Sequence, residues 1–175
     1  MSPVQWLRMS DALDVDVLFV GAGPASLAGA YHLARRAREA PPPSGLPSIA
    51  VLEKGAEIGA ISFTGGVMDP RALAALIPDY EARGAPLGAR VVRDELVWLT
   101  SRQAIPFPVV PPPFRNRGNH VVSLSPLVRW LATQAEAEGV SMFPSFAAAS
   151  LLYDRTDRVV GVRTGDKGVD RRGRR

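Results

Sequence analysis

A glycine-rich turn after a short apolar run has the residue types that could bind a phosphate group. The run 17–20 leads into Gly21-Ala22-Gly23-Pro24-Ala25-Ser26. Gly21 permits a tight turn after a strand, and Gly23 removes the Cβ that would stand between the backbone and a pyrophosphate. A helix that begins near Pro24 would direct free N–H groups and the positive end of its dipole at the phosphates. This pattern predicts a dinucleotide-binding turn.

An acid at the end of the next apolar run indicates the kind of dinucleotide. Residues 48–52 read as a second strand, which ends on Glu53 and Lys54. A carboxylate at this place can accept a hydrogen bond from a ribose 2′-hydroxyl and repels a 2′-phosphate, so FAD or NAD is favoured over NADP. Ser26 stands where the third glycine is usual, and we expect this to cost some helix–strand packing. The alternative is an ordinary βαβ crossover with Glu53 on the surface.

The elements that must position these residues follow from hydrophobic periodicity and from glycine and proline. We expect a strand at 15–20, a helix at 24–38 and a strand at 48–52, while the glycine-rich stretch 57–66 shows no periodicity. Further along we expect a helix from Asp69-Pro70 to 77, short strands and proline-rich turns within 89–124, a strand at 120–124, a helix at 125–138 ended by Gly139, a strand at 140–143, and a β-hairpin of 148–153 with 159–163.

This order of elements predicts an α/β fold, namely an incomplete Rossmann-like FAD-binding domain of three-layer ββα topology with a β-rich inserted segment. The predicted division of the chain is residues 1–66 as the first part of that domain, 67–119 as an inserted cap segment, 120–169 as the second part with a β-hairpin crossover, and 170–175 as a basic tail.

Composition and charge exclude several function classes. The formal net charge of +4 comes mostly from the basic tail, and no stripe of basic and aromatic residues predicts nucleic-acid binding. The chain has no cysteine, which excludes a disulfide or a cysteine-ligated metal site within it. We expect His32 and His120 to be surface or half-buried residues rather than metal ligands. No run is long enough to span a membrane and no signal peptide is evident, so a cytoplasm-facing protein is predicted.

Taken together, the motifs resemble the electron-transfer flavoprotein–ubiquinone oxidoreductase family of the glutathione-reductase-like flavoproteins. The runs 20–25 and 51–54 are common to many FAD-binding proteins, whereas 69–73 and 129–139 are more specific, and the resemblance extends over residues 16–173. It implies these FAD-binding positions: Gly21, Ala22, Gly23, Pro24, Ala25 and Ser26 at the pyrophosphate, Glu53 and Lys54 at the ribose, Gly59, Ala60, Ser62 and Gly65 near the flavin, and Thr164 and Gly165 where the hairpin returns to the cofactor domain.

The resemblance also implies a function. In that family, FAD takes electrons from electron-transfer flavoprotein and passes them to ubiquinone at a membrane surface, with the help of a 4Fe–4S cluster that this cysteine-free chain cannot ligate. It places the longer family protein at the cytoplasmic face of a bacterial inner membrane, and the present chain alone is expected to be soluble. The family's later part supplies a further strand beside the first one, so we expect weak FAD binding by the present chain.

Two alternatives stay open at this point. One is a related FAD-dependent flavoprotein that reduces isoprenoid double bonds or hydroxylates aromatic compounds. The other is a non-catalytic, nucleotide-binding chain. Because the flavin carries the chemistry, no catalytic residue is nominated. We expect Asp69, Glu95 and Asp154 to be a helix cap, a surface residue and a turn residue, respectively.

Overall fold

A small parallel sheet lies at the centre of the computed structural model, which describes residues 12–165. It consists of β1 (Val17–Val20), β2 (Ile49–Glu53) and β8 (Ser141–Pro144), in the order β1-β2-β8 with both pairings parallel. All five residues of the central strand β2 are buried, which explains its continuous apolar run. Within the described residues β1 pairs with β2 alone, so its other edge is open.

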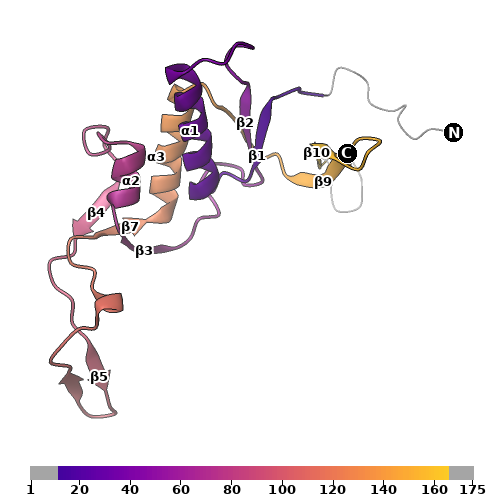
Figure 1. Cartoon of the computed structure of the whole chain (residues 1–175). Helices are drawn as coiled ribbons and strands as arrows, with labels where there is room; N and C mark the ends of the chain where they lie inside the picture. The colour runs from indigo at the N-terminus through magenta and orange to yellow at the C-terminus, as the bar shows by residue number, and fades with distance from the viewer. Residues whose placement is uncertain (1–11, 166–175) are drawn as a thin grey trace.

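Two helices cover one face of this sheet and pack against each other (Figure 1). They are α1 (Pro24–Glu39) and α3 (Leu124–Ala137). Each buries residues three or four positions apart, the spacing that puts side chains on one helix face. Gly139, with a φ of 86°, lies just beyond the end of α3, as predicted. The buried residues are Leu27, Ala30, Tyr31 and Ala34 of α1 and Leu127, Val128, Leu131, Ala132 and Ala135 of α3.

A second, antiparallel sheet extends the molecule beyond the lower ends of these helices in Figure 1. Its strands are β3 (Gly65–Met68), β7 (His120–Ser123) and β4 (Leu87–Arg90), in the order β3-β7-β4, and the short helix α2 (Arg71–Leu76) follows β3. The strand β7, which was predicted at the start of the second cofactor-domain segment, therefore pairs with β4 of the inserted segment and with β3, which crosses the predicted boundary between residues 66 and 67. The domain division itself stays a prediction.

The strand β3 was not predicted, because its Gly-Gly start has no side-chain pattern. The structure supplies the reason for glycine at this point. A Cβ on Gly65 would lie 2.7 Å from the backbone oxygen of Val122, closer than real Cβ contacts come, so the β3–β7 pairing requires glycine there.

An extended arm projects from the second sheet, as Figure 1 shows. It carries the two-stranded ribbon of β5 (Val97–Leu99) and β6 (Ala104–Pro106), and the short 3-10 helix η1 (Pro112–Phe114) lies between the ribbon and β7. Every residue of β5 and β6 is exposed. The expectation of short strands and proline-rich turns in this region is confirmed.

The predicted β-hairpin is also confirmed: β9 (Ala148–Tyr153) pairs antiparallel with β10 (Val159–Thr164), on the side of β1 away from the helices (Figure 1). Asp154 holds its turn. The carboxylate accepts hydrogen bonds from the hydroxyl and N–H of Thr156, both at 2.7 Å, and from the N–H of Arg158 at 3.1 Å. These bonds, that of the Thr156 hydroxyl above all, lower the pKa of Asp154 to about 2.

This hairpin turn is expected to open in acid. Because the pKa of Asp154 is depressed on folding, its contribution is fully present above pH 3.8 and is lost as the pH falls through about 2. Amide hydrogen exchange at Thr156 and Arg158 should therefore be slow at pH 5 and accelerate, beyond the intrinsic change, near pH 2. Asp154→Asn should show the faster exchange already at pH 5. Equal protection in both proteins would contradict this role of Asp154.

The two histidines and Glu95 have the exposure expected of them, whereas Asp69 differs from its expected role. His32 is exposed, and His120 is half-buried, with Nδ1 3.2 Å from the Gly88 oxygen. Asp69 accepts a hydrogen bond from the N–H of Arg71, but it precedes Pro70, which is the N-cap residue of α2, so the prediction of Asp69 as the helix cap is wrong. Glu95 is exposed and pairs with Arg93. Between residues 12 and 165, no group of three or more potential metal ligands is assembled, and no helix is long and apolar enough to cross a bilayer.

Candidate nucleotide-binding site

The glycine turn after β1 forms an open cradle at the start of α1. Gly21 has a φ of 94°, and its N–H donates to the oxygen of Leu52 at 2.7 Å, which ties the turn to β2. An ideal Cβ placed on Gly21 or Gly23 meets no heavy atom within 4 Å, so the protein leaves this space free. A phosphate group fits such a space.

The N-terminus of α1 offers hydrogen-bond donors to that space. Gly23 is the N-cap residue, and no side chain caps the helix. Pro24 has no N–H, and the first intrahelical bond runs from the N–H of Leu27 to the oxygen of Gly23 at 3.0 Å. The N–H groups of Ala25 and Ser26 precede that first bond, at the positive end of the helix dipole. This arrangement suits an anion such as a pyrophosphate.

The predicted acid lies directly beside the turn. The side chain of Glu53 is buried, with only 6% of the residue exposed. Its Oε2 accepts a hydrogen bond from the N–H of Ala22 at 3.0 Å, and its Oε1 accepts one from the N–H of Gly55 at 2.7 Å. Hydrogen bonds to a charged group contribute about 1.5–3 kcal/mol each. The alternative of a surface Glu53 in an ordinary crossover is therefore wrong.

A cavity opens where the strands β1 and β2 end, which is the edge at which parallel α/β sheets bind their ligands. Residues of the turn after β1, of the end of β2 and of the segment after β8 meet here. The sequence did not predict a role for Phe146, whose N–H donates to the backbone oxygen of Glu53 at 2.8 Å. Its position just after the parallel strand β8 could have indicated that it lies at the ligand-binding edge of the sheet. The lining residues are Val20, Gly21, Leu52, Glu53, Lys54, Ile61, Phe146, Ala147 and Ala148.

The predicted crossover residues reach the same region. Thr164 pairs with Ala148, and the N–H of Gly165 donates to the oxygen of Ala147 at 3.0 Å. Because Ala147 and Ala148 line the cavity, the hairpin brings Thr164 and Gly165 next to it.

The residues predicted to lie near the flavin are placed differently. None of Gly59, Ala60, Ser62 and Gly65 lines the cavity, although Ile61 of the same stretch does. Gly59 is buried against α3, whereas Ala60 and Gly65 are exposed and Ser62 is half-buried. Their contact with a flavin stays a prediction.

Close packing of α1 on β1 depends on a glycine that the sequence reasoning did not consider. A Cβ on Gly29 would lie 3.2 Å from Cε1 of the Phe19 ring. Gly29 thus provides the close approach expected of the third fingerprint glycine. Ser26, three residues earlier, is half-buried.

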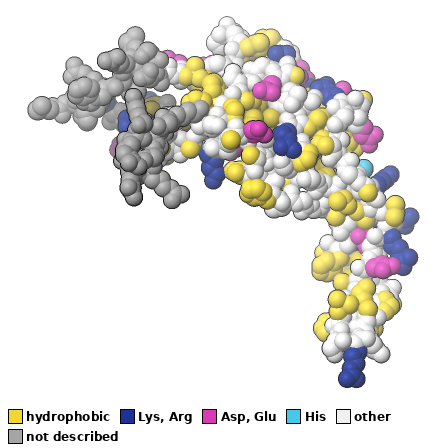
Figure 2. Space-filling model, turned by 180° about the vertical axis from the view of Figure 1, so that it is seen from behind, with side chains coloured by type: hydrophobic (Ala, Val, Ile, Leu, Met, Phe, Trp, Pro, Cys, Tyr) yellow, Lys and Arg dark blue, Asp and Glu magenta, His cyan; other side chains and the backbone are white. Residues whose placement is uncertain are grey.

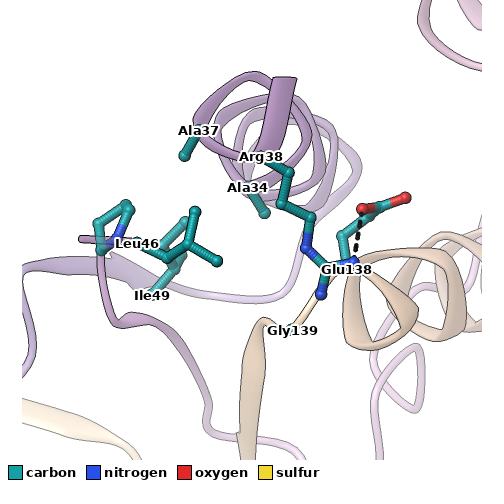
Figure 3. A pocket seen from close by; sticks show the side chains of 8 residues that line it. Ala34, Ala37, Arg38, Leu46, Ile49, Glu138 and Gly139 are labelled. Atoms are coloured by element: carbon teal, nitrogen blue, oxygen red, sulfur yellow. Dashed lines mark ion pairs between the residues drawn. The ribbon is translucent and has the colours of Figure 1, made fainter. Parts of the chain in front are cut away.

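A second cavity lies near the amino-terminal ends of β2 and β8, at the opposite ends of these strands from the first cavity (Figure 3). Arg38 at the end of α1 pairs with Glu138 after α3 at 3.5 Å, and Ala34, Leu46 and Ile49 form apolar walls. The two charges face each other, so this cavity presents an ion pair rather than a cradle for an anion.

Comparisons with known proteins agree with this geometry. No protein-family model matches the chain. The mitochondrial electron transfer flavoprotein-ubiquinone oxidoreductase of Oryza sativa subsp. japonica is 43% identical over 170 residues, which cover 97% of this chain and 28% of the relative. The electron transfer flavoprotein-ubiquinone oxidoreductase of Pseudomonas aeruginosa is 44% identical, over 92% of this chain and 29% of the relative. The mitochondrial one of Rattus norvegicus is 40% identical, over 93% of this chain and 26% of the relative. The chain thus spans less than a third of their length.

Solved structures share the fold at low sequence identity. A geranylgeranyl bacteriochlorophyll reductase-like protein from Thermoplasma acidophilum aligns with a TM-score of 0.61 at 18% identity, over 86% of this chain and 34% of that one. The FAD-dependent halogenase CndH aligns with a TM-score of 0.56 at 18% identity, over 88% and 33%. The predicted α/β, Rossmann-type fold is confirmed. By sequence, this chain corresponds over nearly its whole length to the N-terminal part of the electron transfer flavoprotein-ubiquinone oxidoreductases.

Proposed function

We propose that this chain is the FAD-binding part of an oxidoreductase that carries electrons from reduced electron-transfer flavoprotein to ubiquinone. The observation that carries the proposal is the open glycine cradle at the N-terminus of α1, with the carboxylate of Glu53 beside it. The names of its relatives, which cover far more chain than is present here, supply the donor and the acceptor. Bound FAD would accept and release the electrons.

The chain's own residues bind and orient the cofactor in this proposal. Gly21 and Gly23 leave room for the pyrophosphate, and the N–H groups of Ala25 and Ser26 neutralise it. Glu53 and Lys54 line the cavity where the adenosine half would lie. No side chain is assigned an acid–base role, because electron transfer through a flavin requires none from the protein.

The test of this proposal is cofactor binding by the purified chain. We expect AMP to bind in calorimetry, because the glycine turn, the N-terminus of α1 and Glu53 that would hold it are all present, and FAD to bind weakly enough to be lost on gel filtration. No quinone reduction is expected from this chain alone. Failure of AMP and FAD to bind at any concentration would remove the proposed function. A stoichiometric flavin band after gel filtration would instead show that residues 1–175 already form a complete flavin site.

We propose that the arm that carries β5 and β6 contacts a membrane surface, a contact that the family resemblance implies. Trp98 and Leu99 are 62% and 75% exposed, and Ile105, Phe107 and Val109 add further apolar surface. Figure 2 shows hydrophobic side chains along this arm and a basic side chain at its end. Exposed arginines at 102, 115 and 117 complement an anionic headgroup layer, and aromatic residues favour the interface.

Binding of the chain to lipid vesicles tests whether the arm contacts a membrane surface. The chain is expected to sediment with anionic phosphatidylglycerol vesicles and to show a blue shift of tryptophan fluorescence. Trp98→Asp should weaken this binding about tenfold or more, since it removes an aromatic side chain from the interface and adds a negative charge. Trp98→Phe is the matched control and should retain binding. If Trp98→Asp sediments like the unaltered chain, the arm is not the contact surface.

A further inference from the structure

The buried carboxylate of Glu53 connects two separate loops. It accepts one hydrogen bond from the N–H of Ala22, inside the glycine turn after β1, and another from the N–H of Gly55, in the turn after β2. Each carboxylate oxygen accepts one of these bonds, at 3.0 Å and 2.7 Å. Both donors are backbone N–H groups, so these bonds fix the path of the backbone rather than the position of a side chain.

The surroundings of Glu53 reinforce this connection. Its backbone oxygen accepts the N–H of Phe146, and the N–H of Ser145 donates to the oxygen of Gly55 at 2.7 Å. A Cβ on Gly55 would lie 3.2 Å from Oε1 of Glu53, so glycine at position 55 allows the carboxylate to come this close. The turns after β1 and β2 and the segment after β8 therefore meet at one residue.

We infer that Glu53 is a positioning residue that holds the glycine turn in its phosphate-accepting shape before any nucleotide arrives. This role is separate from a hydrogen bond to the ribose, since both bonds are present in the protein alone. It rests on the proposed function only for the identity of the ligand. A side chain at 53 that accepts one bond instead of two releases either Ala22 or Gly55.

The two roles predict opposite results with a ligand that has no ribose. Inorganic pyrophosphate can occupy the glycine cradle but has no ribose hydroxyl group to donate to Glu53. If Glu53 served only the ribose, Glu53→Gln would leave pyrophosphate binding unchanged or tighten it, because a negative charge near the anion is removed. If Glu53 positions the turn, Glu53→Gln weakens pyrophosphate binding, and we expect a loss of about fivefold or more.

The experiment combines calorimetry with hydrogen exchange in nucleotide-free protein. The N–H groups of Ala22 and Gly55 should exchange about tenfold or more slowly than unstructured amides in the unaltered chain, and this protection should be lost in Glu53→Gln. Glu57→Gln, an exposed acid in the following turn, is the matched control and should change neither measurement.

Each result decides the inference. Weaker pyrophosphate binding together with lost protection of Ala22 supports it. Unchanged or tighter pyrophosphate binding by Glu53→Gln overturns it, and leaves the proposed function intact. Should Glu53→Gln fail to fold, exchange in the unaltered chain still decides, because unprotected amides at Ala22 and Gly55 would contradict the two hydrogen bonds. Absence of pyrophosphate binding by the unaltered chain would count against the proposed function and not against the exchange result.

Discussion

Gly23→Ala is expected to weaken nucleotide binding about tenfold or more and to leave the fold unchanged. The backbone of Gly23, with φ −78° and ψ 169°, suits any residue, and its new Cβ would meet no protein atom within 4 Å. Alanine reduces the freedom of the unfolded chain, which stabilises by about 0.4–1 kcal/mol at a compatible site, but it is less favourable than glycine at the N-cap of a helix, so we expect the two effects to offset each other. The same Cβ, however, occupies the space in front of the α1 N-terminus where we propose that the pyrophosphate lies.

The expected size of this effect is a loss of AMP affinity of about tenfold or more, equal to about 1.4 kcal/mol. Calorimetry with AMP and urea denaturation of the same preparation measure the two quantities separately. Gly21→Ala is the comparison, because its φ of 94° adds strain of about 1–2 kcal/mol to any steric effect on the ligand. Undiminished AMP affinity in Gly23→Ala would show that the phosphates do not pass over this residue.

The βαβ unit was predictable because each of its signals is local in the sequence. A continuous apolar run marked β2 as buried, helical spacing marked α1, and glycine at 21 and 23 marked the turn between β1 and α1. The same reasoning identified β8 and the β9–β10 hairpin. These elements are set by periodicity and by backbone conformations that few residues adopt.

The parts that were missed depend on contacts between distant segments. The strand β3 forms because Gly65 packs directly against the backbone of Val122, and the residues 65–68 alone do not indicate that contact. Likewise, the acid at 53 was predicted from its place in a motif, but its two partners are backbone N–H groups, which every residue type except proline provides. Sequence patterns show which side chains are available, whereas loop-to-loop hydrogen bonds appear only in three dimensions.

Gly59→Ala, which adds one methyl group in the chain's glycine-rich stretch, is expected to be strongly destabilising. Gly59 has a φ of 81°, a conformation that costs other residues about 1–2 kcal/mol. Its Cβ would also lie 2.8 Å from the backbone oxygen of Ser125 in the first turn of α3, and 3.4 Å from Cγ of Arg129. The Ser125 oxygen belongs to a helix backbone and cannot rotate away, so the loop or the helix must move.

Strain and displacement together should lower the free energy of unfolding by about 3 kcal/mol, which is a large part of the 5–15 kcal/mol typical of a folded protein. Urea denaturation of Gly59→Ala measures it. Gly66→Ala is the matched control, because its φ is not positive and its Cβ would meet no atom within 4 Å. We expect it to change stability by less than about 0.5 kcal/mol.

Gly59→Ala is also expected to affect the candidate nucleotide-binding site. Gly59 lies two residues before Ile61, which lines the nucleotide cavity, so a displaced loop also displaces a wall of that cavity. Gly59→Ala should therefore weaken AMP binding in the protein that remains folded, although residue 59 does not line the cavity. Equal stability of Gly59→Ala and Gly66→Ala would mean that the loop does not dock on α3. Lower stability with unchanged AMP affinity would mean that docking serves the fold alone.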